Sequence, residues 1–146
     1  MADPKPSKQK TRRSVRVHGI DEARAACDAA KIAGVPIALW SPPFGAARMG
    51  PLWFQQMIAL IGEEFPDLPV DAVLDCGDAP GHALAALRQG VPLIALTARP
   101  AIRRKIEAIA AAGGARLVRR PPRIFDPASP SGDRAALKKW LDRSAD

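Results

Sequence analysis

A short pattern that ends a helix and starts a strand recurs along this chain. It reads AGVPIAL at 33–39, QGVPLIAL at 89–96 and AGGARLV at 112–118, each with glycine between a helix-like segment and an apolar run. Glycine often ends helices because it adopts the left-handed conformation without a Cβ clash. A short apolar run is typical of a buried strand. Repeated junctions of this kind predict βα units with right-handed crossovers, and therefore an α/β fold.

Five strands joined by helices follow from this pattern. The strands are expected at 14–18, 35–40, 70–76, 91–97 and 115–119, and the helices at 22–33, from Pro51 onward, and at 82–89, 100–112 and 133–141. We expect a three-layer, doubly wound, mostly parallel five-stranded sheet. The flavodoxin-like strand order 2-1-3-4-5 is preferred over half of a (βα) barrel.

Helix ends and apolar faces can be predicted from residue type. Asp21 is a natural N-cap and Gly34 a natural stop for the first helix, and Pro51 can occupy the first position of the next one. The expected apolar faces are Leu52, Trp53, Leu60, Ile61 and Phe65 after Pro51 (with Gln56 and Met57 at the margin), Ile102, Ile106 and Ile109 in 100–112, and Leu137, Trp140 and Leu141 in the last helix.

The length of 146 residues is that of one domain. Residues 1–13 are rich in Lys and Pro and predict a disordered basic tail; 14–123 form a single α/β domain; 124–146 form an arm and a helix that docks on it. No run approaches the roughly 20 apolar residues of a membrane helix. Two cysteines without a CxxC pair predict neither a disulfide framework nor zinc. We therefore expect a cytoplasmic protein without metal or cofactor.

Charge is unevenly distributed. The net charge is +7, with basic residues concentrated in 1–16 and 99–123 and an excess of acidic residues in 21–90. Such asymmetry indicates a basic surface that attracts anionic partners. Nucleic acid is one such partner, through the tail and the Arg99–Arg123 face. Stacking on single strands is not favoured, because the chain has no tyrosine and few other aromatic residues.

The stretch VLDCGDAPGHALAAL at 73–87 contains the strongest site signal. In open parallel sheets, ligands bind beyond the carboxyl ends of the strands, where the strand order reverses. The order 2-1-3-4-5 would bring the loops 18–21 and 75–82 together there. The candidate catalytic residues are Asp75, Cys76 and His18, and the candidate ligand-binding residues are Asp75, Gly77, Asp78, Gly81, His82, Thr97, Arg99 and Arg120.

Each of these residues also has a purely structural interpretation. Asp75 can be a turn residue, and Asp78 an N-cap or its neighbour before Pro80. Cys76 can be a small buried apolar residue. To act as a nucleophile, its thiol would need a lowered pKa from a helix N-terminus or a base such as His18 or His82.

Two family resemblances bear on the same stretch. VLDCGDAPG resembles the first motif of S-adenosylmethionine-dependent methyltransferases, but Thr97 stands where that family has a ribose-binding acid, and too few strands follow. Residues 70–122 resemble the second half of a response-regulator receiver domain. That resemblance makes Asp75 the phospho-acceptor position, Thr97 the end of the next strand and Arg120 the position of a family lysine. His18-Gly19 replaces the family's metal-binding acids, so the resemblance implies a receiver-like fold without phosphorylation chemistry.

Three functions remain open. The first is a small non-catalytic α/β module that binds a protein partner or a small anionic ligand, with regulation as one role that such binding could serve. The second is an enzyme that uses Cys76 or Asp75 with His18 as base. The third is nucleic-acid binding. Trp53 or Trp140, if exposed, would suit a homodimer.

Overall fold

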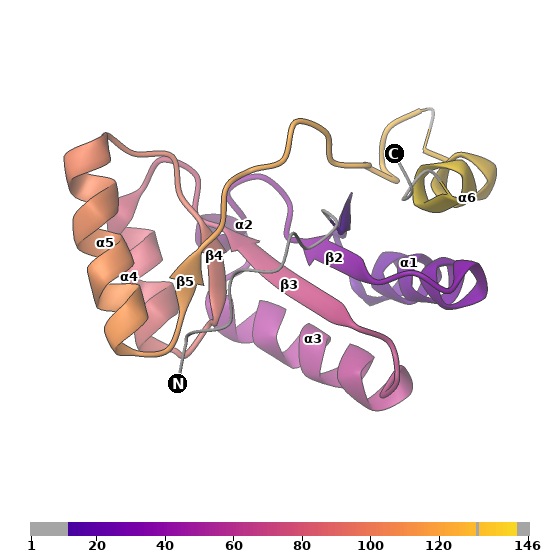
Figure 1. Ribbon diagram of the computed structural model, residues 1–146, viewed down its shortest axis with the longest axis horizontal. Coiled ribbons are helices and arrows are strands. Elements are labelled where there is room, and N and C mark those ends of the chain that lie inside the picture. The colour runs from indigo at the N-terminus through magenta and orange to yellow at the C-terminus, as the bar shows by residue number, and fades with distance from the viewer. Residues whose placement is uncertain (1–11, 131, 143–146) are drawn as a thin grey trace, which may run out of the picture.

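The computed structural model describes residues 12–130 and 132–142 (Figure 1). Its parallel strands are β1 (Arg13–Arg16), β2 (Ile37–Trp40), β3 (Val70–Asp75), β4 (Leu93–Ala95) and β5 (Arg116–Leu117). Its helices are α1 (Ile20–Ala33), α2 (Gly45–Arg48), α3 (Pro51–Glu64), α4 (Pro80–Arg88), α5 (Pro100–Ala112) and α6 (Arg134–Asp142). The predicted α/β class and five-stranded parallel sheet are confirmed. Of the predicted tail 1–13, residues 1–11 lie outside the described residues.

The preferred strand order 2-1-3-4-5 is wrong. The strands lie in the order β1-β2-β3-β4-β5, so β2 separates β1 from β3. Hydrophobic periodicity identifies strands, but it does not say on which side of β1 the next strand is added. Because every right-handed crossover in this sheet moves one position in the same direction, the connecting helices arrive on one face. The order nowhere reverses, and the crevice expected between strands one and three is therefore not formed.

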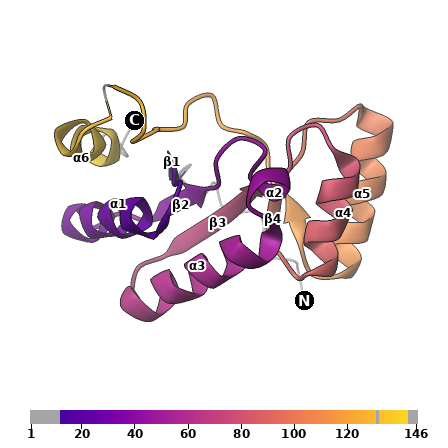
Figure 2. The ribbon, with the colours of Figure 1, turned by 180° about the vertical axis from the view of Figure 1, so that it is seen from behind.

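One face of the sheet carries the main core. Strand residues of this face, such as Val15, Leu39, Leu74 and Ile94, are fully buried against apolar side chains from the helices. The contributing helix residues include Ala26 of α1, Phe54 of α3, Ala86 of α4, Ile106 of α5 and Leu141 of α6. Figure 2 shows α3 running alongside β3. This helix layer fixes which strand side chains point to the opposite face, since side chains alternate along a strand.

We call the opposite face the helix-free face, because no helix of the described residues packs on it. Ala38, Trp40, Val73 and Ala95 form a second buried cluster there, together with Leu93, Val118 and Ile124. Ile124 belongs to the irregular segment 119–125, which supplies the third layer. The structure thus has helices on one side of the sheet and a single strap of chain on the other.

The strap 119–125 leads from β5 back to β1. Phe125 O accepts a hydrogen bond from Arg16 N at 2.7 Å, and Phe125 N donates to Ser14 O at 3.0 Å, which protects the edge of β1. In Figure 1 this segment is the orange chain between β5 and α6. Helix α6 then packs against α1, with Leu137 and Leu141 buried, and Trp140 Nε1 donates to Ser14 O at 3.1 Å.

Several helix ends differ from expectation. The N-cap of α1 is Gly19, and Asp21 lies in the first turn, where its charge favours the helix dipole. Gly34 ends α1 with a φ of 70°, as predicted, and Pro51 occupies the first turn of α3, as predicted. Helix α4 begins at Pro80 and not at His82.

Two apolar helix faces were only partly correct: Ile61, Ile102 and Ile106 pack in the core as predicted, but other members of each face do not. The buried face of α3 is Phe54, Met57 and Ile61, whereas Leu52, Trp53 and Leu60 are 60%, 37% and 47% exposed. The buried and the exposed residues both recur at helical spacing along α3. The rotation of α3 about its own axis is therefore decided by which set packs better against the sheet. In α5, Ile106 is buried but Ile109 is 50% exposed for the same reason.

None of the described helices has both the length and the apolar character needed to cross a membrane.

Candidate functional site

The centre of the site is Asp75, at the carboxyl end of β3 on the helix-free face. Its side chain is fully buried. Arg16 Nη1 and Arg120 Nη2 each donate to Asp75 Oδ2 at 3.0 Å, and Gly77 N donates to Oδ1 at 2.8 Å. A buried carboxylate requires such compensation, because desolvation of an unpaired charge is costly. Asp75 therefore serves as an anchor for two guanidinium groups.

Arg16 connects two strands that are not neighbours. It lies opposite Trp40 in the β1–β2 register, and its guanidinium carbon is 5.7 Å from the centre of the Trp40 ring. From there Arg16 Nη1 reaches Ser41 O at 2.7 Å as well as Asp75. Ser41 Oγ in turn accepts a hydrogen bond from Asp75 N at 2.8 Å. The length of the arginine side chain allows this pairing across β2.

The loops after β2 and β3 pack closely above this cluster. Gly77 has a φ of 60°, and a Cβ atom there would overlap the ring of Phe44. A Cβ on Gly45 would overlap the hydroxyl of Ser41. Phe44 itself adopts a φ of 57° and stays 48% exposed. Gly77 thus allows the two loops to approach each other, and Gly45 leaves room for the Ser41 hydroxyl that accepts the hydrogen bond of Asp75 N.

Cys76 points away from this site. It follows Asp75 directly, and its side chain belongs to the main core on the helix face of the sheet, at 2% exposure. Burial, followed by the charge of Asp75, raises the pKa of the Cys76 thiol to about 12. The thiol is therefore protonated at neutral pH. Consecutive strand residues face opposite sides of the sheet, so Asp75 and Cys76 do not share one site.

His18 also lies apart from Asp75 and Cys76. Its Nδ1 is 2.8 Å from Glu22 Oε1 and 4.0 Å from Asp126 Oδ1. Within the described residues it makes no hydrogen bond or ion pair with Asp75 or Cys76. The three candidate catalytic residues are therefore not assembled into one constellation.

The remaining candidate ligand residues lie at the carboxyl edge of the sheet. Thr97 N donates to Gly77 O at 2.8 Å, which joins the loops after β3 and β4. The side chains of Asp78, His82, Thr97 and Arg99 are exposed, as is Gly81. Asp78 precedes Ala79, the N-cap of α4, without making a side-chain cap bond. Of the predicted ligand-binding residues, Gly77 and Arg120 are the two that donate a described hydrogen bond to the Asp75 carboxylate. No group of His, Cys, Asp and Glu within the described ranges could hold a metal ion.

Sequence reasoning missed two members of the site, namely Arg16 and Trp40. A signal for Arg16 was present, because Ser14 and Arg16 alternate with Val15 and Val17 in the first strand. That alternation places a charged side chain on the face opposite the main core. Its partner could not be found without the order of the strands.

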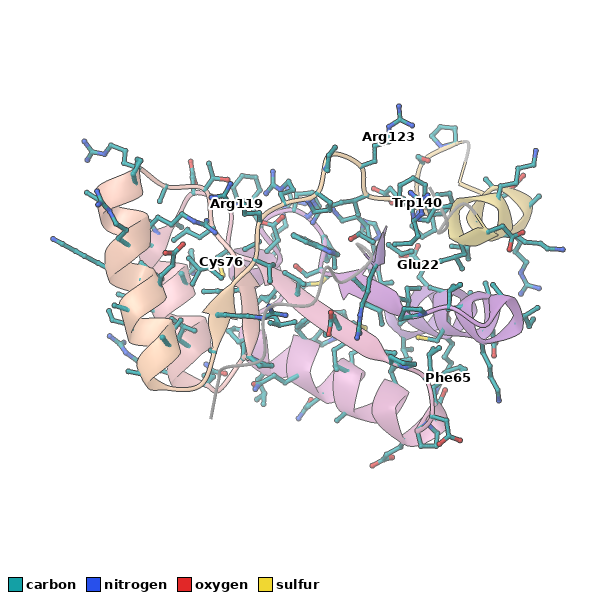
Figure 3. All side chains as sticks on the ribbon, in the orientation of Figure 1. Glu22, Phe65, Cys76, Arg119, Arg123 and Trp140 are labelled. Atoms are coloured by element: carbon teal, nitrogen blue, oxygen red, sulfur yellow. The ribbon has the colours of Figure 1, made fainter. Side chains whose placement is uncertain are left out.

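Positive charge dominates this edge. Arg120 is half exposed, and Arg99, Arg119 and Arg123 have no acidic partner among the residues that the structure describes. In Figure 3, Arg119 lies near β5 and Arg123 extends away from the body of the protein. Together these side chains form what we call the basic edge: Arg99, Arg119, Arg120 and Arg123.

The chain matches no protein-family model and no curated protein.

Proposed function

We propose that this protein is a small, non-catalytic, cytoplasmic module that binds a small anionic ligand at the basic edge. The observation that carries the proposal is the placement of Arg120. Its guanidinium is half exposed, yet it is held in position by the fully buried Asp75. A pre-positioned guanidinium loses less conformational entropy when it binds an anion than a freely rotating one.

The charge balance of the cluster favours an anion. Asp75 is already paired with Arg16, so the two arginines and the carboxylate carry one net positive charge. Arg119 adds a further cation next to Arg120 in the chain. Guanidinium groups match the planar oxygen geometry of carboxylate and phosphate.

The chemistry of the remaining residues supports binding without catalysis. The Cys76 thiol is buried with a pKa raised to about 12, and His18 is paired with Glu22. Neither forms the nucleophile–base pair that the enzyme alternative needs. The resemblance of 70–122 to a receiver domain without phosphorylation chemistry agrees with a binding role.

Isothermal titration calorimetry with inorganic pyrophosphate tests this function. We expect the wild-type protein to bind it at low salt, and Arg120→Gln to weaken binding at least about fivefold, in keeping with loss of a charge-assisted hydrogen bond. Arg88→Gln is the matched control, because Arg88 is exposed in the last turn of α4. That turn is at the opposite end of the helix from Pro80, where the loop after Asp75 enters. It should leave the affinity unchanged.

Absence of pyrophosphate binding would refute the proposal, and two further results would contradict it. One is an equal loss of pyrophosphate affinity in Arg120→Gln and Arg88→Gln, which would show that binding depends on net charge and not on the position of Arg120. The other is tight binding of duplex DNA, steeply salt-dependent and insensitive to Arg120→Gln, which would favour the nucleic-acid alternative.

A further inference from the structure

A hollow of about 210 Å³ lies on the helix-free face. It extends along the strands from Arg12 and Asp71 at one end to Arg119 at the other, and Trp40 and Val118 line it between them. Ala38, Val73 and Leu93 complete an apolar floor. The hollow therefore ends at the basic edge and offers a surface on which a flat apolar group can lie.

Trp40 supplies a donor that the described protein does not use. Its side chain is 2% exposed, and within the described residues its Nε1 is the one buried side-chain nitrogen or oxygen without a hydrogen-bond partner. Buried polar atoms are almost always paired, so this unpaired donor on a residue that lines the hollow points to a partner outside the described chain, which Nε1 meets when the indole shifts toward the hollow. Arg16 lies over the ring and holds it in place. Ser14, 4% exposed, places a hydroxyl in the same lining.

The charges around the hollow indicate an acid with one negative group. Arg12 is neutralised by Asp71, since Arg12 Nη1 lies 3.1 Å from Asp71 Oδ1. Arg119 is exposed and has no acidic partner in the described part of the chain. One unpaired cation therefore remains, at the end of the hollow that meets the basic edge.

We propose that this hollow binds a small ring-bearing carboxylic acid. The carboxylate pairs with Arg119, the ring lies on the apolar floor, and an acceptor atom on the ring receives the hydrogen bond of Trp40 Nε1. This inference rests on the proposed function, because Arg119 belongs to the basic edge, and it names the ligand class.

The indole N–H signals of Trp40, Trp53 and Trp140 in ¹H–¹⁵N correlation spectra of the full-length protein test the inference. 4-Hydroxybenzoate serves as the probe, because it combines one carboxylate, one ring and a ring acceptor. We expect the Trp40 signal to move saturably downfield and the signal of the distant Trp53 to stay unchanged. Arg119→Gln should weaken the apparent affinity at least fivefold, and Arg88→Gln should not change it. Phenol, which lacks the carboxylate, should bind at least tenfold more weakly.

The failure of this inference can be told apart from that of the proposed function. If 4-hydroxybenzoate leaves the Trp40 signal in place while pyrophosphate still binds in an Arg120-dependent manner, the ligand class is wrong and the anion site stands. If pyrophosphate does not bind either, both fail. A nuclear Overhauser contact between Trp40 Hε1 and any of residues 1–11 in the free protein would also overturn the inference, because the chain itself would then supply the partner.

Discussion

Arg16 on β1 donates a hydrogen bond to Asp75 on β3 at 3.0 Å, although β2 lies between the two strands. The guanidinium crosses above Trp40 to reach the carboxylate. Arg120 binds the same carboxylate oxygen from the strap that follows β5. Asp75 thus connects β1, β3 and the strap, and its removal leaves a buried cation behind.

Asp75→Asn should be strongly destabilising. Arg16, 7% exposed, would lose its counter-charge, and breaking a buried ion pair from one side costs about 3–5 kcal/mol. Urea unfolding measures the change in free energy. Asp71→Asn is the control, because its pair with Arg12 is partly exposed and worth about 1 kcal/mol or less. Equal losses in the two variants would show that Asp75 does not hold the cluster together.

Gly77→Ala should destabilise the protein for two separable reasons. A φ of 60° costs alanine about 1–2 kcal/mol, and overlap of the new Cβ with the Phe44 ring adds about 1–3 kcal/mol. In a Phe44→Ala background only the first cost should remain, so a double-mutant cycle of unfolding free energies measures the contact. Gly81→Ala is the control, because nothing lies within 4 Å of its added Cβ. A coupling free energy of zero between Gly77→Ala and Phe44→Ala would disprove the contact between the two loops.

Both cysteines should be unreactive in the folded protein. Burial raises the pKa of Cys27 and of Cys76 from 9.0 to about 12. Ellman's reagent at pH 8 should therefore modify them only after denaturant is added. Rapid modification of the native protein would contradict the placement of Cys76 and revive it as a nucleophile.

The same pKa shifts predict the direction of a stability change in alkali. Between pH 9 and 12 the unfolded chain loses the thiol protons while the folded chain keeps them, so the free energy of unfolding falls as pH rises. Each thiol lowers the free energy of unfolding by at most about 1.4 kcal/mol per pH unit over that range, and it has no effect below that range. Urea unfolding at a series of pH values measures this slope. The part due to the thiols is the difference between the wild type and a double variant that carries Cys27→Ala and Cys76→Ala.

Helix α6 should belong to the cooperative unit of the fold. Leu141 is fully buried against the main core, so Leu141→Ala should cost about 2–5 kcal/mol. Lys139→Ala, an exposed position on the same helix, should change stability by no more than about 0.5 kcal/mol. A Leu141→Ala variant that unfolds α6 without lowering the main transition would show that the helix is only an appendage.

The candidate site shows how far sequence reasoning reached. The stretch at 73–87 was correctly recognised as a strand, a glycine turn and a helix, with Asp75 at the strand end. It also offered Cys76 or Asp75 as a reacting group with His18 as base, but His18 pairs with Glu22 and makes no described contact with either residue. Arg120 was identified from its chain position, whereas Arg16 was not, because its role depends on the strand two positions away.

The sequence by itself determined the local structure: the βα units, their glycine stops and the parallel sheet all follow from patterns within a few residues. Only the tertiary structure decided the strand order, which face of α3 is buried, and the absence of a described helix on one side of the sheet. The physical reason is that these features depend on which side each crossover adds its strand and on how whole elements fit together. The Arg16–Asp75–Arg120 cluster arises at that level, since its members come from β1, β3 and the strap, far apart in the chain.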